Sequence, residues 1–424
     1  MLEKKILHTV VLNTERCKGC VTCMKRCPTE AIRVRHGKAS VNYEKCIGCG
    51  ECVRICPYHA KQAAYDAFET INDYKYKIAI PAPSLFGQFE NPDIDTILNG
   101  LIAIGFDAVY EVGRGAELLS EATKIVLDQG KLAKPVISTA CPAVLELILV
   151  RFSHFKPNLL NMLAPVDIAA KLAREKAIAA GVPADDIGVF FISPCPAKVF
   201  ALKMGLGHNK PVVDGVLAIS DIYKRLRPVL GKLENIKPLS KMGGTGLGWA
   251  ASGGEAAAVF RSKYLAADGI ENVINVLNAI EDNALKGLEF IELNACVSGC
   301  VGGVLNVENP FVAKARLREI KRKLPEKCNT LANEGRPLEF YLWEQEPDFK
   351  DVFRLDESRV SAMDKLLEME KTLGTLPLVD CGMCGAPSCR AFAEDKANGI
   401  VPADYDCPRL NEKTEKSEES AEAE

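Results

Sequence analysis

The chain has 424 residues, 48% of them hydrophobic, so it is long enough to bury a large core and to form two or more domains. It carries 53 basic and 56 acidic residues, a formal net charge of -3, and the basic residues are scattered, which argues against nucleic-acid binding. No window approaches the roughly 20 apolar residues of a membrane span, and the first residues, MLEKKILHTVVL, lack a long apolar signal segment. We therefore expect a cytoplasmic protein that binds neither nucleic acid nor membrane.

The first 72 residues carry one cysteine pattern twice. C-x2-C-x2-C-x3-C-P runs from Cys17 to Pro28 and again from Cys46 to Pro57. The pattern is that of two-cluster bacterial ferredoxins, in which three cysteines of one run and the fourth of the other hold each [4Fe-4S] cluster. Zinc is the alternative, but zinc sites usually combine two C-x2-C pairs. We predict an α+β ferredoxin-type module over residues 1–72, with the ligand sets Cys17, Cys20, Cys23 and Cys56, and Cys46, Cys49, Cys52 and Cys27.

From residue 73 the sequence alternates between short apolar runs and helix-like stretches. The apolar runs are KIAIPAP, FDAVYEV, KPVIST, IGVFFIS, DGVLAIS and LEFIELN, and we predict helices over 165–180 and 254–267. This alternation predicts an α/β domain with largely parallel, buried sheets and flanking helices over residues 73–350. Beyond it we expect a helical linker over 351–375, a small cysteine-rich domain over 376–412, and a disordered tail over 413–424, which has few apolar residues.

Four further cysteines follow predicted strands. Cys141 comes after KPVIST, Cys195 after IGVFFIS, and Cys296 with Cys300 after LEFIELN. Cysteines are common in protein cores, yet two of these precede proline and the C-x3-C pair is flanked by glycines, which is typical of loops. Because loops at the carboxyl ends of parallel strands converge on one crevice, we predict a shared metal site.

Three motifs around these cysteines resemble those of the [FeFe]-hydrogenases. The family's T-S-C-C-P, M-P-C-x2-K-x2-E and E-x-M-x-C-x3-C-x2-G-G-G correspond to the segments at Ser138–Pro142, Ser193–Ala201 and Glu292–Val304. The resemblance spans most of residues 1–310. It implies an iron-hydrogenase-like fold and an H-cluster, in which a [4Fe-4S] cubane is bridged to a diiron subcluster that carries CO, CN and a dithiolate.

The resemblance also implies roles for individual residues. Cys141, Cys195, Cys296 and Cys300 would hold the cubane, with Cys300 as the bridging ligand. Lys198 would donate a hydrogen bond to a cyanide, since an ammonium is a strong donor to an anionic ligand.

The departures from the family bear on proton transfer. Ala140 stands where the catalytic enzymes have a proton-passing cysteine, and Ala201 and Ala164 replace a glutamate and a serine. Glu121 keeps the inner glutamate of the family's proton chain, whereas Lys124 replaces the outer one. Alanine cannot transfer a proton, so the resemblance implies slow turnover with retained dihydrogen binding, as in the sensory branch of the family.

Two further differences change the expected pocket. Ser193 and Asn294 replace methionines, which makes the surroundings of the H-cluster more polar. We therefore include Ala140, Ser193 and Asn294 with Lys198 as cofactor-binding positions, and we expect Lys198 and Glu121 to act in catalysis.

The last cysteine group lies near the C-terminus, at Cys381, Cys384, Cys389 and Cys407. The segment resembles the small [4Fe-4S] domain of corrinoid proteins and of an electron-transport complex subunit, with zinc as the alternative. Cys328 stands alone in a charged region, and we expect it to be a free structural thiol.

These observations predict a slow, reversible hydrogenase that senses dihydrogen or redox state. It would contain four [4Fe-4S] clusters and one diiron subcluster, and its partners would be dihydrogen, protons, a redox or signalling protein and the hydrogenase maturation proteins; a dimer remains open. The alternatives are a non-catalytic hydrogenase-like assembly protein and an electron-transfer subunit. Lys198 and the Cys296–Cys300 pair favour the hydrogenase, because these residues make sense around a diiron subcluster.

Overall fold

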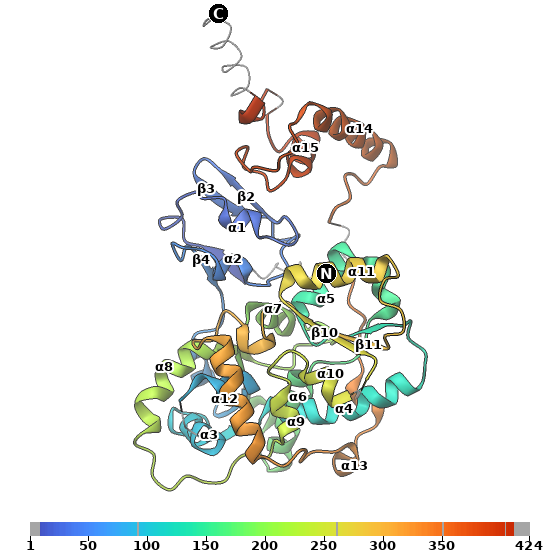
Figure 1. The fold of residues 1–424 in the computed structure, drawn as a ribbon. Coiled ribbons are helices and arrows are strands. Elements are labelled where there is room, and N and C mark those ends of the chain that lie inside the picture. Colours follow the sequence, from blue (N-terminus) through green and yellow to red (C-terminus); the bar gives the residue numbers. More distant parts are fainter. Residues whose placement is uncertain (1–8, 91–92, 260–261, 350–351, 403, 411–424) are drawn as a thin grey trace, which may run out of the picture. The chain divides into compact units, whose positions relative to one another are not determined.

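The computed structural model describes residues 9–90, 93–259, 262–349, 352–402 and 404–410, which divide into two compact units (Figure 1). The large unit consists of Thr9, Ile47–Gly50 and Ala63–Phe349, and the small unit of Val10–Cys46, Glu51–Gln62 and the described part of Lys350–Glu424. The tail predicted to be disordered, 413–424, lies outside the described residues. None of the helices described has the length and hydropathy of a membrane span.

The large unit is built around two parallel sheets. Within the described residues, one sheet has four strands in the order β6-β5-β8-β9 and the other has three in the order β10-β11-β7. The strands are β5 (Tyr76–Pro81), β6 (Ala108–Val109), β7 (Val136–Ile137), β8 (Ile187–Ser193), β9 (Gly215–Ala218), β10 (Tyr264–Asp268) and β11 (Phe290–Asn294). The predicted α/β fold with parallel sheets is confirmed, and each of the six apolar runs contains a strand.

Strand β8 shows why these runs become strands. Every residue of β8 is buried, as expected for a parallel strand covered on both faces. It pairs with β5, where Ile78 faces Val189, and the ring of Phe190 lies edge-on to Tyr74 with 5.7 Å between centroids. A continuous apolar sequence can therefore be buried without leaving backbone polar groups unpaired.

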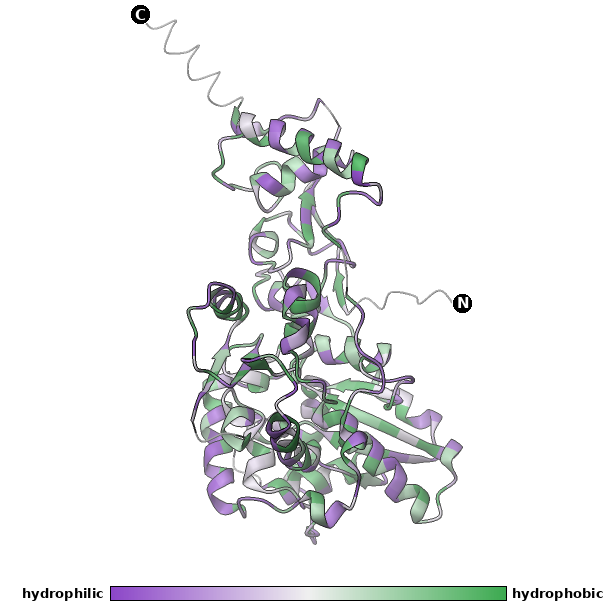
Figure 2. Ribbon diagram, turned by 90° about the vertical axis from the view of Figure 1, so that its right-hand side faces the viewer, coloured by the Kyte–Doolittle hydropathy of each residue, from purple (hydrophilic) through white to green (hydrophobic). Residues whose placement is uncertain are grey.

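Helices cover both sheets, and they carry hydrophobic and hydrophilic residues side by side (Figure 2). Their buried residues join those of the four-stranded sheet in one large hydrophobic core. The helices of the large unit are α3 (Ile94–Ala103), α4 (Val112–Asp128), α5 (Pro142–Arg151), α6 (Pro165–Ala179), α7 (Pro196–Met204), α8 (Ile219–Leu230), α9 (Gly244–Gly248), α10 (Gly254–Val259), α11 (Ile270–Glu281), α12 (Pro310–Lys323) and α13 (Leu331–Glu334).

One helix prediction is wrong in its second half. The helix expected over 254–267 is α10, which ends at Val259, and Tyr264–Asp268 is strand β10. Strand β10 pairs in parallel with β11, with Tyr264 opposite Phe290. Tertiary pairing here outweighs the helix propensity of two alanines. The other predicted helix, over 165–180, corresponds to α6.

The small unit joins two segments that are distant in sequence. The first contains β1 (Val10–Leu12), α1 (Thr22–Lys25), β2 (Ile32–Arg35), β3 (Lys38–Val41), α2 (Glu51–Arg54) and β4 (Lys61–Ala63), whose last residue belongs to the large unit. The second contains α14 (Arg359–Thr375) and α15 (Cys389–Ala397). Each segment has its own buried cluster that includes cysteines, as expected for two small iron-sulfur folds.

The core of the large unit makes a first prediction. Replacing the fully buried Phe190 by Ala should lower the free energy of unfolding by about 3–5 kcal/mol, because it leaves a cavity beside Tyr74. The chain has two tryptophans, Trp249 and Trp343, and both lie in the large unit, so chemical denaturation followed by tryptophan fluorescence reports this unit.

The control is Ile178→Ala, because the Ile178 side chain is 46% exposed. This change should alter the free energy of unfolding by less than about 0.5 kcal/mol. Equal effects of the two substitutions would contradict the packing described for β8.

Candidate active site

Loops at the carboxyl ends of three strands carry the four cysteines of the predicted metal site. Cys141 follows β7, Cys195 follows β8, and Cys296 and Cys300 follow β11. Cys141 and Cys195 cap helices α5 and α7, each of which begins with proline, a residue suited to the first helical position. Because β8 belongs to one sheet and β7 and β11 to the other, the site combines the ends of two sheets, not of the single sheet that sequence patterns suggest.

The thiols of Cys141, Cys195 and Cys300 interact with one another and with the ammonium of Lys198. Burial raises the pKa of Cys141, and it raises the pKa of Cys195 to about 11. A thiolate in this environment therefore needs positive charge nearby. Lys198 provides it, since its Nζ donates to Cys300 Sγ at 3.4 Å.

The charge of Lys198 is itself stabilised by the site. Burial alone would lower the pKa of Lys198, but the sulfurs of Cys300, Cys195 and Cys141 together raise it above its ordinary value. The lysine is thus a permanently charged donor in a buried pocket.

The turn between Cys296 and Cys300 depends on a glycine. Gly299 has a φ of +83°, and its N–H donates to the carbonyl of Cys296 at 3.0 Å. A Cβ at this position would lie 2.5 Å from Ser252 N. Only glycine fits, and its turn sets the direction in which both cysteines project.

The larger of two neighbouring cavities adjoins these cysteines and opens in part to solvent. Residues that line it include Ala140, Cys141, Lys198, Glu255, Glu292, Asn294 and Cys300. Thiol ligands and an ammonium donor that meet at one cavity fit an iron-sulfur cluster.

The smaller cavity brings together three alanines. Ala140, Ala164 and Ala201 all line it, beside Lys198 and Asp167. The resemblance implies that these alanines stand where the family has a cysteine, a serine and a glutamate. The structure brings the three positions to one place next to the predicted cluster site.

Glu121 lies on α4, where its carboxylate pairs with Lys327 and accepts the N–H of Leu331 at 2.6 Å. Burial raises the pKa of Glu121, but the contacts with Lys327 and Leu331 lower it overall. Among the described residues, those that line the two cavities include neither Glu121 nor the exposed Lys124. The catalytic role of Glu121 stays a prediction.

Asn294 and Ser193, the two polar residues expected in place of methionines, make different contacts. Asn294 lines the large cavity and donates to Glu292 Oε1 at 2.8 Å. The hydroxyl of Ser193 instead donates to the carbonyl of Cys195 at 3.1 Å and accepts its N–H at 3.3 Å. Ser193 therefore shapes the turn that presents Cys195.

Two buried carboxyls of the site, those of Glu255 and Glu292, are not among the predicted site residues, and Glu292 belongs to the third motif. Both carboxyls are 4% exposed and line the large cavity. Glu255 accepts from the hydroxyl of Ser138 at 2.6 Å, and Glu292 accepts N–H groups from Gly253 and Ala256 at 2.9 and 2.8 Å. The available signal was a single glutamate within the small-residue stretch GGEAAA.

Burial and the neighbouring Glu292 raise the pKa of Glu255 to about 8. Burial also raises the pKa of Glu292, although backbone N–H groups oppose this effect. The pair therefore holds a proton at neutral pH, and Glu292 is the partner that stays ionised, because the N–H groups of Gly253 and Ala256 and the amide of Asn294 donate to its carboxylate. A carboxyl that can gain and lose a proton near pH 7 is suited to acid-base chemistry.

The small unit assembles its cysteines in three groups. Cys23 has Cys17, Cys20 and Cys56 as electrostatic neighbours, Cys52 has Cys27 and Cys46, and Cys384 has Cys381 and Cys407. Cys389 shares the buried cluster of Cys384 and Cys407. The thiol of Cys328, in the large unit, is exposed.

Cys49 lies in the loop Ile47–Gly50, which belongs to the large unit. A Cβ built on Gly48 would lie 3.3 Å from Ala197 Cα, and one on Gly50 would lie 2.8 Å from Val304 Cγ2. Both glycines have positive φ. The loop can therefore pack tightly against residues that neighbour Cys195 and Cys300.

Comparison with known families accounts for all three parts of the sequence. The model of the iron-only hydrogenase large subunit, C-terminal domain, matches residues 75–267 and 259–304, more than half of the chain. A 4Fe-4S dicluster domain matches residues 9–57, and an Fe-S cluster family matches residues 376–409. The match boundaries follow the cysteine groups.

Solved [FeFe]-hydrogenases share the fold. A structure from work on oxygen inactivation, through modification and degradation of the 2Fe subcluster, is 15% identical with a TM-score of 0.51. A glutamate-to-alanine variant of HydA1 from Chlamydomonas reinhardtii is 16% identical with a TM-score of 0.50. Each comparison covers 66% of this chain and 95% of the other. The chain therefore belongs to the iron-only hydrogenase family and carries a 4Fe-4S dicluster segment and a further Fe-S cluster segment.

Proposed function

We propose that the protein oxidises dihydrogen and reduces protons slowly and reversibly at an H-cluster, and that it reports dihydrogen or redox state. The observation that carries the proposal is the cavity shared by Cys141, Cys300 and Lys198, with alanines at the positions of the family's proton chain. The cavity supports binding of dihydrogen, whereas the alanines support a slow exchange of protons. A protein that binds its substrate but turns it over slowly is suited to sensing.

When bound, the H-cluster would supply the chemistry that interconverts dihydrogen with two protons and two electrons. Cys141, Cys195, Cys296 and Cys300 would hold it, and Lys198 would donate a hydrogen bond to an anionic ligand. Hydrogenase maturation proteins would deliver the diiron subcluster. Val112 and Phe191 contribute an apolar part of the lining.

Glu255 is our candidate for the group that exchanges protons with the site. It lines the same cavity as Cys300, and its raised pKa lets it give or take a proton near neutral pH. The hydroxyl of Ser138 donates to its carboxyl and keeps it in place. Glu255 would take over the proton transfer that the family assigns to a cysteine at the position of Ala140.

Electrons would leave or enter through the accessory clusters. The glycines on either side of Cys49 lie against Ala197 and Val304, near ligands of the active-site cluster. A redox or signalling protein would receive the electrons. A non-catalytic assembly protein is the second candidate, favoured by the loss of the proton chain at Ala140, Ala164 and Ala201.

An anaerobic infrared spectrum tests the proposed function. After the protein is supplied with the diiron subcluster or with maturation proteins, CO and CN stretching bands should appear and should change under dihydrogen. Cubane-loaded protein without such bands would favour the assembly or electron-transfer alternatives. A dihydrogen evolution rate equal to that of a bidirectional [FeFe]-hydrogenase in the same assay would contradict the sensing role.

Glu255→Gln should reduce dihydrogen evolution by about 10²–10⁴-fold, because the amide cannot deliver a proton, while the infrared bands remain. In the native protein, dihydrogen evolution should fall as the pH rises through about 8, where Glu255 loses its proton, and dihydrogen oxidation should rise. The variant should lack the inflection near pH 8 and keep only the gradual dependence that follows from protons being a reactant.

The matched control is Glu234→Gln, which makes the same substitution at an exposed position. Its turnover should stay close to that of the native protein. Glu121→Gln separates the two routes: if it loses the activity and Glu255→Gln keeps it, protons pass by way of Glu121 on α4, as the family resemblance implies.

Cys49→Ser should slow electron exchange with an external redox dye by an order of magnitude and leave the infrared bands of the active site intact. The reason is that the loop of Cys49 contacts the active-site region. Cys328→Ser, which changes an exposed thiol outside the cysteine groups, is the control. Unchanged exchange in Cys49→Ser would mean that electrons enter elsewhere.

A further inference from the structure

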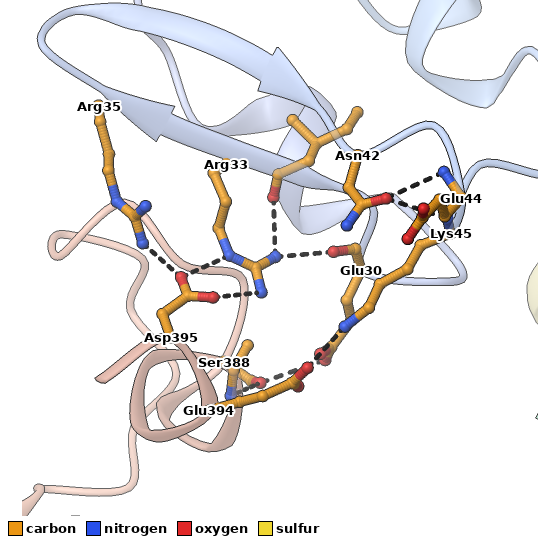
Figure 3. Close-up of polar contacts among 11 residues, drawn as sticks. Glu30, Arg33, Arg35, Asn42, Glu44, Lys45, Ser388, Glu394 and Asp395 are labelled. Atoms are coloured by element: carbon orange, nitrogen blue, oxygen red, sulfur yellow. Dashed lines mark hydrogen bonds and ion pairs between the residues drawn. The ribbon is translucent and has the colours of Figure 1, made fainter. Parts of the chain in front are cut away.

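Within the small unit, opposite charges hold the C-terminal cysteine segment to the ferredoxin-type segment (Figure 3). Asp395, on α15, is 2% exposed and accepts from Arg33 Nε at 2.7 Å and Arg33 Nη2 at 3.1 Å. Arg35 pairs with the same carboxylate, and Lys45 pairs with Glu394 at 2.7 Å. The two-pronged Arg33 contact fixes distance and orientation, which a lysine could not do.

A backbone contact brings the C-terminal cysteine loop against strand β2. Val34 N donates to the carbonyl of Gly385, the residue after Cys384, at 3.0 Å. Gly385 has a φ of +80°, and a Cβ there would lie 2.1 Å from Val34 O. Any side chain at this position would separate the two segments, so the glycine permits the close approach.

The backbone beside Cys381 faces the side chain beside Cys23. A Cβ built on Gly382, the residue after Cys381, would lie 3.0 Å from the methyl carbon of Met24, the residue after Cys23. Next to this contact, the ammonium of Lys25 donates to the carbonyls of Asp380 and Pro387, the latter at 2.8 Å. Met24 and Gly382, each next to a predicted cluster ligand, therefore lie side by side.

We propose that the C-terminal cluster exchanges electrons directly with the first ferredoxin-type cluster, held by Cys17, Cys20, Cys23 and Cys56, across the contact between Met24 and Gly382. This inference rests on the proposed function for its purpose, because it makes the C-terminal cluster the outer member of the electron relay. One electron moves in each step: one [4Fe-4S] cluster is oxidised as the other is reduced, and no bond forms or breaks.

The surroundings of the contact suit electron transfer better than a purely structural clamp. A clamp needs the ion pairs of α15, but it does not need two ligand loops in contact. The polarisable side chain of Met24 occupies the contact itself. Lys25 places a positive charge beside the carbonyls that precede Cys381 and Ser388, which favours the reduced form of a cluster there.

Low-temperature electron paramagnetic resonance of the full chain tests the inference. The protein is loaded with [4Fe-4S] clusters but not with the diiron subcluster, and it is fully reduced. The native spectrum should show splitting and faster spin relaxation of the first ferredoxin-type cluster, and Cys384→Ser, which removes the C-terminal cluster, should abolish that contribution. The proposal would be overturned if the native spectrum were the simple sum of the Cys384→Ser spectrum and the signal of one uncoupled C-terminal cluster.

A second comparison separates contact from cluster loss. Arg33→Glu with Arg35→Glu reverses the charges that face Asp395, and the matched control, Arg354→Glu with Arg359→Glu, makes the same change at exposed positions of the small unit. The first variant should lose the spin coupling together with the hydrogen-exchange protection of the Val34 amide, and the control should keep both.

If the Arg33→Glu, Arg35→Glu variant loses the hydrogen-exchange protection of the Val34 amide but keeps the spin coupling, the proposal is also overturned, because the coupling then does not depend on this contact. Because these measurements use protein without the diiron subcluster, such a result would leave the proposed dihydrogen chemistry standing. Conversely, absent infrared bands would reject that chemistry without affecting the relay.

Discussion

The cost of burying thiolates is the constraint on which the active site depends. Burial raises the pKa values of Cys141 and Cys195, so these sulfurs can stay ionised only beside positive charge. Lys198 is buried among them and bonded to Cys300. An iron cluster would supply the remaining charge. The two sheets are needed because a single sheet edge does not bring β7, β8 and β11 to the same place.

The same constraint explains the distribution of polar groups in the cavity. Three alanines occupy the side where the family has a proton chain, whereas two buried carboxyls, Glu255 and Glu292, occupy another part of the lining. Two adjacent buried carboxylates would repel each other, and a shared proton relieves this repulsion. The pocket therefore holds a carboxyl that can gain and lose a proton.

In the small unit, too, buried charges are stabilised by opposite charges, here by ion pairs between side chains. Basic residues on the ferredoxin-type segment face acidic residues on the C-terminal segment, and the pairing is strongest at the buried Asp395. Removing one partner of a buried pair leaves an uncompensated charge, so such contacts specify one arrangement. Here the specified arrangement brings two cysteine loops together. The ion pairs between the two segments and the closeness of their cysteine-bearing backbones thus have the same cause.

The sequence by itself determined the cysteine groups, the parallel α/β class and the residues that differ from the family, because ligand spacing and apolar runs are local properties. Only the tertiary structure decided that Tyr264–Asp268, the second half of a predicted helix, forms strand β10. It also decided that Ser193 forms hydrogen bonds with the backbone of Cys195 and that Glu255 lines the cavity. The joining of Asp395 to Arg33 was equally invisible in the sequence. These features depend on contacts between residues far apart in the chain, whose pairing no local pattern specifies.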